Sequence, residues 1–136
     1  MKVNCNTLII DDDNISCFLA KNVFRQLGNN VKIRTLANGK EAVDFFKSSQ
    51  NGYPDLILLD INMPLMNGFE FLDWYEANHL QGSSKFTIYT SSEREKDMEK
   101  AFAYRDVIDY ITKPVTKDKI AKLMSQVRNG VELNTE

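Results

Sequence analysis

The sequence predicts an α/β fold, because short apolar segments alternate along it with longer segments whose apolar residues recur at helical spacing. One of the short segments, Leu56–Leu59, is apolar at every position, which is typical of a central parallel strand covered by helices on both faces. A length of 136 residues suits one domain. We therefore expect a single domain over residues 1–136, with a core from about residue 5 to residue 129 and a short polar C-terminal tail.

The first two strand and helix pairs are marked by turn residues as well as by periodicity. Strands are expected at residues 7–10 and 31–36. Gly28 can end the first helix in a left-handed conformation, and Asn38-Gly39 turns the chain into the second helix. The residues expected to face inward are Ile15, Phe18, Leu19, Val23 and Leu27 in the first helix, and Ala42, Val43 and Phe46 in the second.

The last three pairs follow the same pattern. Strands are expected at residues 55–60, 86–90 and 107–112. Ser91 or Ser92 can cap the fourth helix, and Thr116 opens the fifth. The residues expected to face inward are Phe69, Leu72 and Tyr75 in the third helix, Met98, Ala101 and Phe102 in the fourth, and Ile120, Leu123, Met124 and Val127 in the fifth.

Reactive side chains follow four of the five expected strands. Right-handed crossovers give an open parallel sheet with helices on both faces, and such sheets bind ligands beyond the carboxyl ends of their strands. In the flavodoxin-like strand order 2-1-3-4-5, the first and third strands are neighbours, so the acids after them converge. The residues in question are Asp11, Asp12 and Asp13 after the first strand, Asp60 after the third, Thr90 after the fourth and Lys113 after the fifth.

This acidic cluster predicts a site for a divalent cation. Crowded carboxylates repel one another, and each raises the pKa of its neighbours unless a positive charge lies among them. Oxygen ligands with few carboxylates suit Mg²⁺. A free carboxylate can also attack phosphorus and form an acyl phosphate, while Lys113 and the Thr90 hydroxyl can contact the phosphoryl oxygens.

Composition argues against several other classes of protein. A formal net charge of -2 offers no general attraction to nucleic acid or acidic lipid. No apolar run is long enough to span a bilayer and the N-terminus lacks a signal-peptide core, so we expect a cytoplasmic protein. Cys5 and Cys17 are interpreted as reduced thiols, and His79 as a surface histidine.

Four segments together resemble the receiver domain of two-component response regulators, and the single-domain chemotaxis regulator in particular. "IIDDDN" resembles the acidic motif of that family, and "DLILLDINMPLMNGFEFL" resembles its phosphoacceptor segment. "IYTSS" is similar to its Thr/Ser motif, and "DYITKPV" to its motif of an aromatic residue followed by Lys-Pro. The resemblance extends from the first strand to the last helix.

The resemblance implies a set of roles around one aspartate. Asp60 would be the phosphorylated residue. Asp12, Asp60 and the main-chain carbonyl of Asn62 would bind Mg²⁺, and Asp11 would hold the metal through water. Asp13 would be a spectator near the start of the helix.

The resemblance also implies a switch. Thr90 and Lys113 would contact the phosphoryl group, Tyr110 would be the aromatic residue whose position reports phosphorylation, and the bond between Lys113 and Pro114 would be cis. The donor would be a sensor histidine kinase or a histidine phosphotransfer protein. The output would be a downstream protein that recognises the face of the fourth helix, fifth strand and fifth helix.

The protein would therefore be a phosphoacceptor rather than an enzyme with a separate substrate. We expect no output domain, no direct contact with nucleic acid or membrane, and a monomer or a dimer that forms on phosphorylation. The sequence departs from the usual family pattern at Asp106, Val107, Ser91 and Asn67. Asn62 and Ser92 are the positions expected to control the access of water to the phosphoryl group.

Two other functions share the same sheet edge. An aspartate-nucleophile phosphatase resembling the haloacid dehalogenase family would use Asp11 and Asp13, then Thr90 and Lys113, but after the lysine the chain offers only Asp118 where such enzymes need an acidic pair. A flavodoxin-like module would bind a flavin or another cofactor there, but the expected glycine-rich phosphate loop is missing after the first strand.

Overall fold

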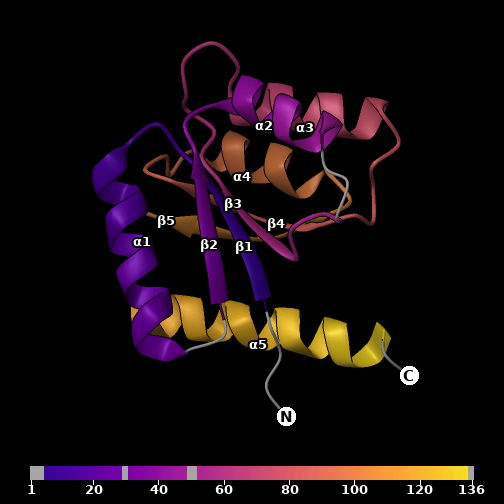
Figure 1. Ribbon diagram of the computed structural model, residues 1–136. Helices are drawn as coiled ribbons and strands as arrows, with labels where there is room; N and C mark the ends of the chain where they lie inside the picture. The colour runs from indigo at the N-terminus through magenta and orange to yellow at the C-terminus, as the bar shows by residue number, and fades with distance from the viewer. Residues whose placement is uncertain (1–4, 29–30, 49–51, 135–136) are drawn as a thin grey trace.

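The computed structural model describes residues 5–28, 31–48 and 52–134 of the chain (Figure 1). Its centre is a parallel sheet of five strands in the order β2-β1-β3-β4-β5, which confirms the predicted flavodoxin-like α/β fold. The strands are β1 (Cys5–Ile10), β2 (Val31–Leu36), β3 (Leu56–Leu59), β4 (Lys85–Thr90) and β5 (Val107–Thr112).

Five helices cover the two faces of this sheet. α1 and α5 lie on one face, and α2, α3 and α4 lie on the other (Figure 1). Their bounds are α1 (Asn14–Leu27), α2 (Gly39–Lys47), α3 (Gly68–Ala77), α4 (Glu95–Phe102) and α5 (Lys117–Asn134). The last helix therefore continues through most of the segment that was expected to be a polar tail.

The sheet separates two apolar cores, because successive side chains of a strand point to opposite faces. Leu8 and Ile10 of β1 face the core under α2, α3 and α4, where Phe71 and Tyr75 lie among other aromatic residues. Ile9 faces the smaller core under α1 and α5. All four residues of β3 are buried, as predicted for the central strand.

The strand register aligns the carboxyl ends of β1 and β3. Ile10 lies beside Leu59 in the ladder between the two strands, so the residues that follow them, Asp11 and Asp60, emerge at the same edge. The N–H of Asp60 donates to the carbonyl of Ile10 over 2.9 Å, and that of Asp11 donates to Leu36 over 3.0 Å. Backbone hydrogen bonds thus fix the start of both acidic segments.

The predicted inward face of α1 was wrong for four of its five residues, and right for Val23. Ile15 is 70% exposed and Phe18 is 59% exposed, while Leu19 and Leu27 are 43% and 40% exposed. The buried residues are instead Ser16, Cys17, Ala20 and Phe24, with Val23 half-buried beside them. Small side chains at positions 17 and 20 let the helix pack closely against the sheet, whereas the sequence pattern favoured the larger apolar residues.

Three predicted details at helix ends were also wrong. Gly28 is extended, with φ of -174°, rather than left-handed. Neither Ser91 nor Ser92 caps α4, which begins at Glu95 without a side-chain cap. In the same helix Ala101 is buried as expected, but Phe102 is 51% exposed. The predicted inward residues of α2, α3 and α5 are buried, except that Met124 is only partly buried.

Candidate functional site

Three carboxylates meet at the carboxyl edge of the sheet. Asp11, Asp12 and Asp60 each place one carboxylate oxygen within 4.8 Å of the other two. Asp11 and Asp60 are buried, with exposed fractions of 3% and 5%, whereas Asp12 is exposed. The convergence predicted from the strand order is therefore present, and it has both a buried side and a side open to solvent.

Backbone amides orient the two buried acids. The N–H of Asp13 donates to Oδ1 of Asp11 over 2.9 Å, and the N–H of Asn62 donates to Oδ1 of Asp60 over 3.1 Å. Each acid thus accepts from the residue two positions further along its own loop. These bonds leave the second oxygen of both carboxylates directed toward one neighbour, Lys113.

Lys113 brings a positive charge to the two buried acids. Its Nζ lies 2.7 Å from Oδ2 of Asp11 and 3.3 Å from Oδ2 of Asp60. The backbone N–H of Lys113 donates to the carbonyl of Thr90 over 2.8 Å, which ties the end of β5 to the end of β4. The bond between Lys113 and Pro114 is cis, as the family resemblance implied.

The electrostatics of the site are unbalanced. Burial raises the pKa of Asp11 to about 6, although the hydrogen bond from Lys113 and that from the Asp13 N–H oppose this rise. Burial would lower the pKa of Lys113, but its contacts with Asp11 and Asp60 outweigh burial and raise it. Among the described residues, one ammonium group therefore pairs with two of the three carboxylates in the cluster.

The donor set fits a hard divalent cation. Oδ2 of Asp11 is fully buried, and its close partner among the described residues is the Lys113 ammonium, 2.7 Å away. That ammonium is shared with Asp60, and buried charge that is not fully compensated is costly. The three acids supply only oxygen ligands, which Mg²⁺ prefers.

Thr90 and Tyr110 are linked to each other through one loop residue, Ser92. Thr90 is fully buried, and its hydroxyl oxygen accepts the N–H of Ser92 over 3.4 Å. The Tyr110 hydroxyl donates to the carbonyl of Ser92 over 2.9 Å, and its ring is half-buried. Asn62 is exposed, and the role predicted for its carbonyl stays a prediction.

Asp13 is separate from the acidic cluster. Its carboxylate accepts the N–H of Ile15 over 3.0 Å and the hydroxyl of Ser16 over 2.8 Å, so it caps α1. This agrees with its expected place near the start of the helix. A phosphatase of the haloacid dehalogenase type would need Asp13 beside Asp11 in the reaction, and the cap directs it elsewhere.

Sequence reasoning missed a glycine that shapes the site. A Cβ atom at Gly68 would collide with the carbonyl oxygen of Asp60 and lie 2.9 Å from Cα of Ile61. The N–H of Gly68 also donates to the carbonyl of Ile61 over 3.3 Å. The start of α3 thus lies directly against the backbone that carries Asp60, and only the absence of a side chain permits this approach.

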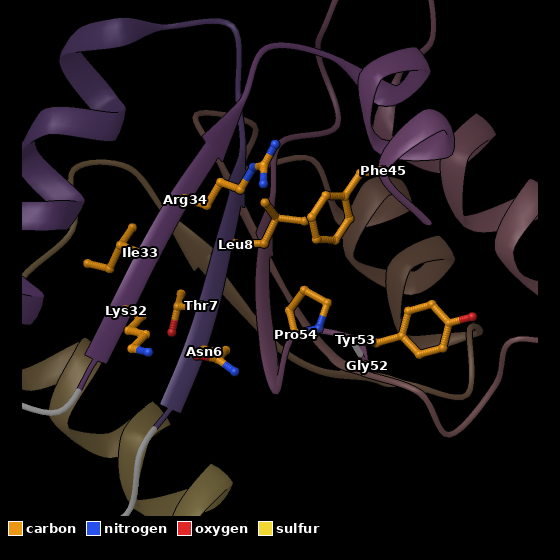
Figure 2. Close-up of a pocket in the computed structure, with 10 residues that line it drawn as sticks. All are labelled: Asn6, Thr7, Leu8, Lys32, Ile33, Arg34, Phe45, Gly52, Tyr53 and Pro54. Carbon is orange, nitrogen blue, oxygen red and sulfur yellow. The ribbon is translucent and has the colours of Figure 1, made fainter. Parts of the chain in front are cut away.

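A hollow of about 250 Å³ lies away from the acids, near the amino ends of β1 and β3 (Figure 2). Lys32 and Arg34 of the edge strand β2 and Phe45 of α2 line it, together with Tyr53 and Pro54. The Arg34 guanidinium lies 5.1 Å from the centre of the Phe45 ring. None of its described lining residues carries a carboxylate, so the candidate chemistry belongs to the acidic edge.

In the described part of the chain, no helix combines the length and apolar character needed to cross a bilayer.

Residues 7–125 match the family model of the response regulator receiver domain. Two-component response regulator ARR22 of Arabidopsis thaliana is similar to this chain, with 30% identity over 122 residues that cover 90% of the chain and 82% of that protein.

Two further relatives agree in length and shape. Two-component response regulator 24 of Arabidopsis thaliana is 29% identical over 125 residues, which cover 92% of this chain and 85% of that protein. The crystal structure of a two-component response regulator from Cytophaga hutchinsonii superposes with a TM-score of 0.84 at 29% identity, covering 93% of this chain and 99% of that one. The chain belongs to the response regulator receiver domain family.

Proposed function

We propose that this receiver domain is a phosphorylation-dependent signalling switch that accepts a phosphoryl group on Asp60 in the presence of Mg²⁺. The observation that carries this proposal is the convergence of Asp11, Asp12 and Asp60 within 4.8 Å, with Lys113 against the two buried acids. Signalling by phosphorylation is also what membership of the family implies.

In the proposed reaction, a carboxylate oxygen of Asp60 attacks the phosphorus of the donor. A bond forms between that oxygen and phosphorus, the bond from phosphorus to the donor nitrogen breaks, and the leaving imidazole takes up a proton. Asp12, Asp60 and the carbonyl of Asn62 would hold Mg²⁺ directly and Asp11 would hold it through water, and the ion would supply positive charge for the phosphoryl oxygens.

Two further residues act on the transferred group. Lys113 is 3.3 Å from Asp60 and can pair with a phosphoryl oxygen once that carboxylate becomes an acyl phosphate. The Thr90 hydroxyl accepts from Ser92 and keeps its own proton for a second phosphoryl oxygen. Asp60 is consumed and restored in each cycle, so the domain acts as a phosphoacceptor without a separate substrate.

The exposed apolar surface of α1 supports a protein as the donor. Ile15, Phe18 and Leu19 lie on the helix that begins directly after the acidic segment, and Leu65 in the loop after β3 is 81% exposed. Ile15, Phe18 and Leu19 are spaced to share one face of the helix, and an exposed apolar face favours an apolar partner surface. A sensor histidine kinase or a histidine phosphotransfer protein would dock there and present its phosphohistidine to Asp60.

The proposed output is a change at the face of α4, β5 and α5. A phosphoryl oxygen would draw the Thr90 hydroxyl, and Tyr110 would move as its contact with the loop after β4 changes. A downstream protein would recognise the altered face. The buried free thiols Cys5 and Cys17 are in keeping with a cytoplasmic location.

Intact-mass spectrometry with phosphoramidate tests this proposal. The wild-type chain should gain the mass of one phosphoryl group only when Mg²⁺ is present, and hydroxylamine should remove it. Asp60→Asn should gain nothing, while Asp13→Asn, a matched change at the cap of α1, should be phosphorylated like the wild type. No mass gain in the wild type, or an equal gain in Asp60→Asn, contradicts the proposal.

A further inference from the structure

Ser92 connects three elements of the molecule through its three polar groups. Its N–H donates to the Thr90 hydroxyl oxygen at the end of β4 over 3.4 Å. Its carbonyl accepts from the Tyr110 hydroxyl of β5 over 2.9 Å. Its own hydroxyl donates to Oδ2 of Asp97 in α4 over 2.6 Å. No other residue of the loop after β4 contacts all three elements by such bonds in the described structure.

Asp97 is built to hold this residue. It is buried, with an exposed fraction of 8%, although it is a charged residue in the first turn of a short helix. Besides Ser92, it accepts from Arg94, whose Nε lies 3.2 Å from Oδ2. The Arg94 N–H in turn donates to the Ser92 hydroxyl over 3.3 Å, which closes a small network.

This network ties the uncapped start of α4 to the loop after β4. The residue before the helix, Arg94, makes no side-chain cap, and the orphan amides of a helix start normally need one. The bond from Ser92 to Asp97 anchors the first turn from the other direction. The position of α4 therefore depends on where Ser92 lies.

We propose that Asp97 is a positioning residue of the site, which holds Ser92 and thereby makes the first turn of α4 follow the Thr90 hydroxyl. This inference rests on the proposed phosphorylation of Asp60. When a phosphoryl oxygen attracts the Thr90 hydroxyl, the oxygen that accepts the Ser92 N–H moves, and Ser92 moves with it. Asp97 then follows, because it is hydrogen-bonded to the Ser92 hydroxyl. The contact with Tyr110 is a separate branch that leaves from the Ser92 carbonyl.

The two branches can be cut separately. Ser92→Ala removes the hydroxyl that reaches Asp97 but keeps the N–H and the carbonyl that meet Thr90 and Tyr110. Ser92→Thr restores a hydroxyl. Ser91→Ala is the matched control, because Ser91 is the exposed neighbour and its side chain has no described partner.

Amide NMR spectra with and without phosphoramidate and Mg²⁺ show whether the first turn of α4 responds to phosphorylation. In the wild type and in Ser91→Ala, the resonances of Thr90, Tyr110 and residues 95–97 should all shift on phosphorylation. In Ser92→Ala, Thr90 and Tyr110 should still shift, whereas residues 95–97 should lose most of their shift. Ser92→Thr should restore it.

A double-variant cycle identifies Asp97 as the partner. Asp97→Ala should cause the same loss at residues 95 and 96, and the variant with both changes should lose no more than Asp97→Ala alone, because the bond between Ser92 and Asp97 is already absent there. Additive losses, or a full shift of α4 in Ser92→Ala, overturn the inference while leaving the proposed function intact. A wild-type chain that accepts no phosphoryl group overturns both.

Discussion

The residues that make the acidic site suitable for a metal ion also lower the stability of the folded state when no ion is bound. Asp12 adds a third negative charge beside Asp11 and Asp60, and among the described residues Lys113 alone forms ion pairs within this cluster, with the two buried acids. Like charges at this distance repel. In the absence of a cation the cluster therefore destabilises the fold, and cation binding to the folded state should reverse this effect.

Asp12→Asn tests whether repulsion among the three carboxylates lowers stability and whether Mg²⁺ reverses it. In metal-free buffer the variant should unfold at a higher urea concentration than the wild type, because one repulsive charge is gone. Added Mg²⁺ should stabilise the wild type markedly and the variant much less. Asp44→Asn, on the exposed face of α2, removes a carboxylate far from the cluster and should leave the Mg²⁺ effect unchanged. A variant that gains as much from Mg²⁺ as the wild type would contradict the prediction.

Gly68→Ala tests the close approach of α3 to Asp60. Alanine normally favours a helix over glycine, but here its Cβ would meet the backbone of Asp60 and Ile61. We expect the free energy of unfolding to fall by about 1 to 3 kcal/mol, as for other overpacked sites, and phosphorylation to slow.

Gly28→Ala provides the matched control, because a Cβ at Gly28 meets nothing within 4 Å among the described residues and φ there is -174°. It should unfold like the wild type or be slightly more stable. Chemical denaturation in urea compares the two variants. Equal stabilities would show that the loop after β3 can move aside at little cost.

Among the elements, helix α1 has one face that packs against the core and another face that is exposed and available to a partner protein. Phe24 is 1% exposed and Phe18 is 59% exposed, although both are phenylalanines of one helix. Phe24→Ala should lower the free energy of unfolding by about 3 to 5 kcal/mol. Phe18→Ala should change it by less than about 0.5 kcal/mol. Urea unfolding followed by circular dichroism measures both, and similar losses would reverse the assignment of the two faces.

The same helix separates the two routes of phosphorylation. Phe18→Ala should leave the rate with phosphoramidate unchanged, because Asp60 and its neighbours are untouched. Transfer from a phosphorylated histidine phosphotransfer protein should slow, since that donor must dock on α1. Equal slowing with both donors would mean that Phe18 supports the site itself rather than a protein contact.

At the scale of the whole molecule, the strand order and the meeting of the acids could be predicted from the sequence, because both depend on repeated local patterns. Buried runs mark strands whatever their neighbours, and topology then places Asp11 beside Asp60. The inward face of α1 could not be predicted, since it depends on how closely Cys17 and Ala20 approach the sheet. The role of Ser92 depends on contacts with residues from three elements.

Stability of the whole molecule should fall in alkali. Burial raises the pKa of the Cys5 thiol above its ordinary 9.0. Burial and the neighbouring Asp106 raise the pKa of Tyr75 well above its ordinary 10.0, and burial raises that of Tyr89 to about 12. Between these ordinary values and the raised ones, the unfolded chain loses protons that the folded chain keeps. The free energy of unfolding therefore decreases as the pH rises above about 9.

Tyr75→Phe isolates one contribution to this decrease. In the wild type, the Tyr75 hydroxyl donates to Asp106 over 2.7 Å. The variant lacks this bond and should therefore be less stable than the wild type at pH 7. Between pH 9 and 11, the free energy of unfolding should decrease less in the variant than in the wild type, because phenylalanine cannot ionise in the unfolded state. Urea unfolding at several pH values in this range gives both slopes. Parallel slopes would mean that ionisation of Tyr75 does not contribute, and that other groups cause the alkaline loss.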